Sequence, residues 1–137
     1  MRSLNIISVA VVVVLCFLCP TVSRAGMDTM TDARLFRLEL QLEPTQPVVG
    51  NNAAILTVSD ARTNRKIDDA VIEIALWMTV HSHGSPKKPE IKKAGDGRYH
   101  VGNLYYTMEG DWDLLVTIQN DNSRDTATFS ISNVKKR

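Results

Sequence analysis

The sequence predicts an all-β protein built as an antiparallel β-sandwich. Apolar and polar residues alternate over several short stretches, and turn-forming residues separate these stretches at spacings of about 8 to 15 residues. No helical period is visible after residue 25. These features are typical of an immunoglobulin-like sandwich of about seven strands, although the cysteine pair of true immunoglobulin domains is absent.

The first three strands follow from their apolar patterns. The first has an apolar residue at every second position and ends at Pro44, which has no N–H to donate to a ladder. The second ends in a charged turn at 60–66. The third is the most apolar and is expected to be central, with both faces covered, and its Trp77 is expected to fill the core together with Trp112. These strands are expected at 35–42, 53–59 and 71–78.

Four further strands are expected in the second half of the chain. An Asp-Gly pair at 96–97 predicts a tight hairpin. A polar turn at 120–123 separates the last two strands, of which the first alternates cleanly. The four strands are expected around Ile91 and at 99–106, 112–118 and 126–131.

Residues 1–25 are predicted to be a secretory signal peptide. An apolar run follows Arg2, and small residues precede Gly26. The run is shorter than the roughly 20 residues of a spanning helix, but the uncharged stretch 4–22 could serve as an uncleaved anchor helix. The protein is therefore expected to be secreted or periplasmic, with residues 4–22 as its attachment to the inner membrane if they are kept.

The remaining chain is expected to hold one domain, at 35–134, behind a flexible tether at 26–34. Both cysteines, Cys16 and Cys19, lie in the predicted leader, so the mature domain would have neither a disulfide nor a thiolate metal site. Loss of two arginines with the leader changes the formal net charge from +1 to −1. This charge gives no basic excess for nucleic-acid binding.

The candidate site is a His-x-His-Gly segment at the end of the third strand. His81 and His83 are two of the three histidines, and in extended backbone residues two apart point to the same side. Met78 lies three residues before His81, and Met108 lies in a turn that could meet the histidines at one end of a sandwich. Two imidazoles and two thioethers would suit copper(I).

Other interpretations of these residues stay open. Two imidazoles with Glu109 or Asp111 would suit copper(II) or zinc. Met78 and Met108 could instead fill the core, because methionine packs into irregular gaps, and the two histidines could simply be solvated.

Several other features carry no chemistry. His100 has no partner nearby in sequence and is expected to be structural. Ser82 and Ser85 flank histidine but lack the glycine elbow of a hydrolase, so no enzymatic activity is expected.

The chain also resembles the YtkA-like domain family, which is related to the FixH-type accessory proteins. The matching motifs occur in order at 49–52, 69–72, 77–84, 97–99 and 108–112. The resemblance implies a secreted or anchored bacterial β-sandwich, in some members attached to metal efflux or copper-handling systems. It maps the family's methionines and histidines onto Met78, His81, His83 and Met108.

The chain departs from the family pattern at three positions. Thr79 and Glu109 stand where the family usually has proline, and Ser82 replaces a glycine. The loop is therefore expected to be less rigid here.

Two functions follow as expectations. The first is a membrane-associated copper-binding accessory or delivery module that is not an enzyme. Its partners would be the metal ion and a membrane protein complex or efflux system. The alternative is a non-metal interaction domain that docks on a membrane complex through a sheet face or the histidine loop.

Overall fold

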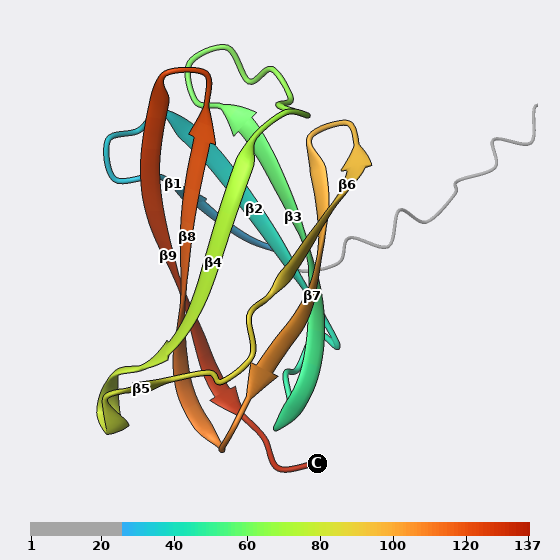
Figure 1. Cartoon of the computed structure of the whole chain (residues 1–137), viewed down its shortest axis with the longest axis vertical. Coiled ribbons are helices and arrows are strands. Elements are labelled where there is room, and N and C mark those ends of the chain that lie inside the picture. Colours follow the sequence, from blue (N-terminus) through green and yellow to red (C-terminus); the bar gives the residue numbers. More distant parts are fainter. Residues whose placement is uncertain (1–25) are drawn as a thin grey trace, which may run out of the picture.

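The computed structural model describes residues 26–137 and confirms the immunoglobulin-like antiparallel sandwich (Figure 1). The predicted signal peptide at 1–25 lies outside the described residues. The elements in chain order are β1 (Met27–Met30), β2 (Phe36–Glu43), β3 (Gly50–Asp60), β4 (Val71–Met78), the 3₁₀ turn η1 (Thr79–His81), β5 (His83–Gly84), β6 (Glu90–Gly95), β7 (Arg98–Tyr106), β8 (Gly110–Asn120) and β9 (Ser123–Val134).

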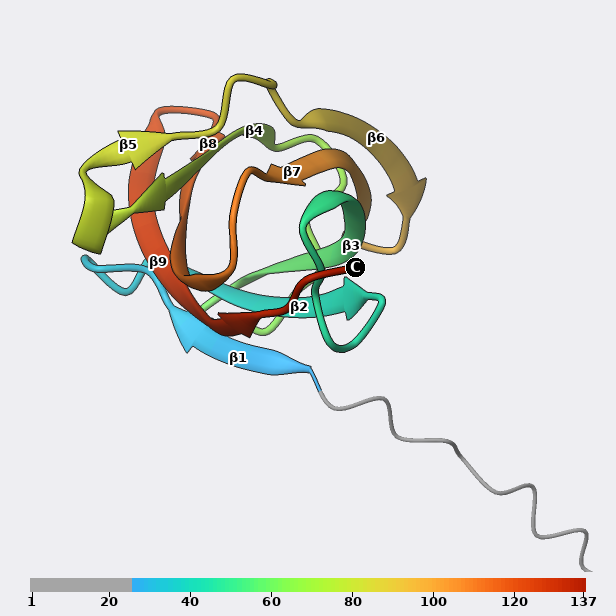
Figure 2. The same cartoon turned by 90° about the horizontal axis from the view of Figure 1, so that it is seen from below.

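The strands form two sheets that face each other (Figures 1 and 2). One sheet has the order β1-β2-β3-β7-β6, the other has the order β5-β4-β8-β9, and neighbouring strands pair antiparallel throughout. All seven expected strands are present. The two that the sequence did not predict, β1 and β5, are the shortest ones at 4 and 2 residues.

The first unpredicted strand corrects the expectation of a flexible tether at 26–34. Met27 to Met30 pair with Leu40 to Arg37 of β2, and the side chain of Met27 packs against the core. The segment after β1 is also held, because Thr31 is buried and Asp32 N–H donates to the Thr126 carbonyl of β9. The sandwich therefore includes β1 and does not begin at Leu35.

The expectation that β4 is a central strand with two covered faces is wrong. Exposure alternates along it residue by residue, so only one face is in the core. Trp77 lies on the outer face with 42% of its surface exposed, whereas Trp112 of β8 is 1% exposed in the core. Glu73 shares the outer face with Trp77, and this carboxylate marks which face of the strand meets water.

Within residues 26–137, no helix is long and apolar enough to cross a membrane.

Candidate metal centre

The predicted histidine segment forms a turn at the end of β4, where the chain reverses into β5. Residues 79–81 make one 3₁₀ turn, and Ser82 takes the left-handed conformation with φ 51° and ψ 43°. The expectation of extended backbone therefore holds for His83, which begins β5, and is wrong for His81, which ends the 3₁₀ turn. Their rings nevertheless lie together, with centroids 6.1 Å apart and planes inclined by 28°, because the turn folds the two residues onto each other.

His83 is the half-buried member of the pair and has a defined orientation. It is the pairing partner of Met78 across β4 and β5. Its Nδ1 lies 3.3 Å from the Gly84 carbonyl oxygen, which can only accept a hydrogen bond, so this contact places the proton on Nδ1. In the neutral ring, Nε2 then carries the free lone pair, and it lies 3.3 Å from Met108 Sδ.

Met108 reaches His83 from the turn between β7 and β8, which lies at the same end of the sandwich as β5 (Figure 1). Met108 is 38% exposed, so this part of the site lies at the surface of the protein. The sequence placed Met108 in this turn, and the structure brings it into contact with His83.

Trp112 joins the two halves of this site, and sequence reasoning missed that role. Its indole Nε1 donates to the Met108 carbonyl at 3.1 Å, and its ring meets the His83 ring edge-on with centroids 5.5 Å apart. Because Trp112 itself is fixed in the core, it holds both the turn and the imidazole. The spacing of four residues between Met108 and Trp112 was the feature of the sequence that could have indicated this hydrogen bond.

Met78 lies beneath the site on the core side and is 2% exposed. Its methyl carbon is 2.9 Å from the position that a Cβ on Gly110 would occupy, so the thioether packs directly under the β7–β8 turn. Gly110 also has φ +116°, which side-chain-bearing residues rarely adopt. This glycine therefore lets the turn that carries Met108 close over Met78.

The two carboxylates considered as ligands are engaged elsewhere. Asp111 Oδ1 accepts a hydrogen bond from Asn133 N–H at 2.7 Å, and Glu109 Oε1 accepts one from Lys136 N–H at 3.0 Å. In the described chain, no group of three or more His, Cys, Asp and Glu side chains could hold a metal. His100 is exposed on β7, where its pairing neighbours are Ile55 and Lys92.

The two residues that stand where the family usually has proline make hydrogen bonds that restrain their loops. Thr79 Oγ1 donates to Asp113 Oδ2 of β8 at 3.0 Å. The bond from Lys136 N–H to Glu109 fastens the Met108 turn to the chain after β9. Each substitute thus restrains its loop by a side-chain hydrogen bond, where proline would restrain it by ring geometry.

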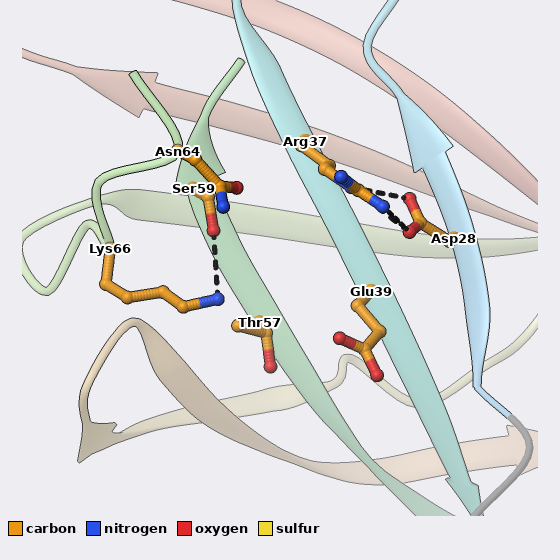
Figure 3. A pocket seen from close by; sticks show the side chains of 7 residues that line it. All are labelled: Asp28, Arg37, Glu39, Thr57, Ser59, Asn64 and Lys66. Atoms are coloured by element: carbon orange, nitrogen blue, oxygen red, sulfur yellow. Dashed lines mark hydrogen bonds and ion pairs between the residues drawn. The ribbon is translucent and has the colours of Figure 1, made fainter. Parts of the chain in front are cut away.

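A polar hollow of about 230 Å³ lies on the outer face of the five-stranded sheet, away from this site (Figure 3). Its cations already have partners: Arg37 pairs with Asp28, and Lys66 Nζ lies 3.3 Å from Ser59 Oγ. We assign no chemistry to it.

The fold and the site together describe a β-sandwich with a cluster of imidazole and thioether groups at one end. The chain belongs to the YtkA-like family, whose model matches residues 25–117. No curated protein matches the chain in sequence.

Two solved structures of FetP from uropathogenic Escherichia coli strain F11 are similar to this chain. The as-isolated protein, which was expressed in the periplasm, matches with a TM-score of 0.55 at 11% sequence identity. The match covers 80% of this chain and 94% of the FetP chain. A copper-bound variant of FetP matches with a TM-score of 0.50 at 13% identity, covering 80% and 92%. At these identities the likeness establishes a shared fold.

Proposed function

We propose that this protein is an extracytoplasmic copper-binding accessory or delivery module without enzymatic activity. His83 and Met108 form the centre of the site, His81 adds a second imidazole from the exposed side, and Met78 adds a second thioether from the core side. Imidazole nitrogen and thioether sulfur are both ligands of copper. Outside the cytoplasm, free thiols are oxidised to disulfides, whereas thioethers do not form disulfides.

The distance between His83 Nε2 and Met108 Sδ is the observation that carries this proposal. Bonds of about 2.0 Å to nitrogen and 2.3 Å to sulfur, taken by analogy with zinc, subtend an angle of about 100° at one ion when the donors are 3.3 Å apart. This angle is close to the tetrahedral value. One ion can therefore bridge the two groups with little movement of either.

The surroundings of this pair also support binding of a metal. The Gly84 carbonyl fixes the tautomer that leaves Nε2 free, which is the usual role of an outer partner of a ligating histidine. The hydrogen bonds of Glu109 and Asp111 turn both carboxylates toward the C-terminal segment, which favours the thioether set over a carboxylate set. That a FetP variant with this fold is copper-bound agrees with the proposal.

Competition titration of copper(I) against a coloured chelator, without oxygen, tests the proposal. We expect the protein to bind one equivalent, and we expect His83→Ala and Met108→Leu each to weaken binding by about tenfold or more. The double variant His81→Ala/His83→Ala should lose copper.

Matched controls are available for both residue types. His100→Ala removes the histidine on β7, and Met30→Leu changes an exposed methionine of β1. Both should bind copper(I) as the wild type does. Absence of binding by the wild type, or equal affinity of the His83 and His100 variants, would overturn the proposal and leave the non-metal interaction domain as the better account.

A further inference from the structure

The edge of β4 next to β5 is open over most of its length. β4 pairs with β8 from Val71 to Trp77, but β5 covers only its last two residues. One further bond, from Ser85 N–H to the Leu76 carbonyl at 3.3 Å, shows that the backbone groups of Leu76 point to this edge. By the alternation of a strand, the N–H and C=O groups of Ile72 and Ile74 point the same way. No residue between 26 and 137 pairs with them on this side.

The sequence after β5 explains why this edge stays open. Continued in the same register, the chain would place Lys87 opposite Ile74 and Pro89 opposite Ile72. Lys87 N–H instead donates to Ser85 Oγ at 3.2 Å, and Pro89 has no N–H, so the ladder that Ser85 begins does not continue. It leaves β4 and crosses to β6 in the other sheet (Figure 1). The connection therefore leaves the edge after Ser85, and the backbone groups of Ile72 and Ile74 remain available.

Two adjoining hollows lie along this open edge and the outer face of β4. Their volumes are about 370 and 390 Å³, and both are lined by Ile74, Ala75 and Lys88. Trp77 extends the first hollow, and Leu115 of β8 extends the second. Trp77 and Leu115 are among the exposed large apolar side chains of the described chain. The two hollows together form a trough along β4. This trough offers apolar contacts beside unpaired backbone groups.

The charges around the trough indicate what fits it. Lys88 lines both hollows and makes no ion pair within residues 26–137, whereas the neighbouring Lys87 lies over the Tyr105 ring at 4.4 Å. A second copy of this chain fits poorly in the one register that would pair Ile72 and Ile74 of both copies with each other. Antiparallel pairing of Ile72 with Ile74 of another copy would place the two Glu73 carboxylates opposite each other, and like charges so placed are destabilising.

We propose that this edge binds an extended segment of a different protein, which adds to the sheet as a strand beside β4. Its backbone would pair with Ile72 and Ile74, its alternate apolar side chains would lie against Ala75 and Leu115, and a carboxylate would face Lys88. The added strand would abut β5, which carries His83. A docked partner would therefore lie next to the candidate copper site, although the docking itself requires no metal.

Titration of metal-free, ¹⁵N-labelled protein with a synthetic peptide tests this inference. The probe is a ten-residue peptide of alternating valine and threonine with one glutamate. We expect amide shifts centred on Ile72 and Ile74, and we expect none with the same peptide N-methylated at every second residue. Absence of shifts, shifts centred elsewhere, or equal binding of the N-methylated peptide would overturn the inference.

A pair of charge-reversal variants distinguishes peptide binding in the trough from a general attraction between the peptide and the charged protein surface. Lys88→Glu should weaken peptide binding about fivefold. Lys92→Glu makes the same change on the exposed face of β6, outside both hollows, and should leave binding unchanged. An equal loss in the two variants would contradict the inference. Because copper is absent, neither result depends on the proposed metal site.

Discussion

The residue that does most to organise the candidate site is Trp112, which binds no metal in our account. Its indole N–H restrains the Met108 turn, and its ring orients His83. Its ring also meets the ring of the buried Tyr106, with centroids 5.6 Å apart and again edge-on. A metal site that depends on the spacing of two donors needs such a support, because small displacements of either donor change the distance that one ion must bridge.

Trp112→Phe should weaken copper(I) binding about tenfold while the fold is kept. Phenylalanine retains an aromatic ring in the core but cannot donate to the Met108 carbonyl, so the turn gains freedom. The competition titration measures affinity, and the width of the Met108 methyl signal in NMR spectra reports the freedom of the turn. Unchanged affinity would show that Trp112 acts only as a core residue.

The matched control is Tyr106→Phe, at the other aromatic ring in contact with Trp112. The Tyr106 hydroxyl is buried and has no hydrogen-bond partner among residues 26–137, and burial raises its pKa. Its removal should leave copper affinity unchanged and raise the free energy of unfolding by about 1 kcal/mol, because an unsatisfied polar group leaves the core.

The two tryptophans also show what single residues reveal in a sequence. Both were expected in the core, and only Trp112 is there. Size and apolarity do not specify which face of a strand a residue occupies. The charged Glu73 does specify the face. Trp77 lies four residues after Glu73 on the same strand, so both side chains point to the same, solvent-exposed face.

At the scale of elements, the turn from β4 through η1 to β5 carries the histidines and holds a strained residue. Ser82 has a positive φ of 51°, where a Cβ is unfavourable and where the family has glycine. The turn persists because Thr79 is bonded to Asp113 and because Ser85 begins the ladder with Leu76.

Ser82→Gly should therefore stabilise the protein, by about 0.5 kcal/mol, since relief of the left-handed strain outweighs the added freedom of the unfolded chain. Ser85→Gly, three residues on at a position without positive φ, should be neutral or destabilising. Denaturant unfolding of the two variants measures both changes. A Ser82 variant less stable than the wild type would mean that the turn is not strained there.

The connection between β1 and β2 is held by Asp125 of β9. Its carboxylate accepts hydrogen bonds from the N–H groups of Ala33 and Leu35. Desolvation by burial raises the pKa of Asp125, but the hydrogen bonds to its charged form outweigh this effect, and the pKa is lowered. The stabilisation is thus present above the unfolded-state pKa of about 3.9 and is lost as the pH falls through the folded-state pKa.

Asp125→Asn should accordingly destabilise the protein at pH 7, by about 2 kcal/mol, because the charged acceptor is lost. The difference from the wild type should shrink as the pH falls below about 3.9, because the unfolded wild-type chain then gains a proton that the folded carboxylate resists. Thermal unfolding at pH 7 and pH 2.5 measures the two differences. Equal differences at both pH values would show that the charge of Asp125 contributes nothing.

At the scale of the whole molecule, the apolar patterns and the turn residues were together sufficient to predict the sandwich and its seven longer strands. They were not sufficient for β1 and β5, which are too short to show a pattern and form because a neighbouring strand offers an open edge. Pairing of this kind depends on three-dimensional context. The expected tether at 26–34 was wrong for the same reason.

The candidate site was predictable in its residues but not in its geometry. The sequence named Met78, His81, His83 and Met108, and it allowed for two turns at one end of a sandwich. Contact between His83 and Met108, which are 25 residues apart, depends on how far β7 and β8 extend and on the indole hydrogen bond of Trp112. Met78 is buried because it lies two residues after Leu76 on β4 and therefore points to the same face, into the core.

X-ray absorption at the copper K edge of the copper(I)-loaded protein tests the central claim most directly. We predict nitrogen neighbours at about 2.0 Å and sulfur neighbours at about 2.3 Å, with fewer sulfur neighbours in Met108→Leu than in the wild type. A wild-type spectrum with nitrogen or oxygen neighbours alone, and no sulfur, would contradict the assignment of the His83 and Met108 pair as the copper site.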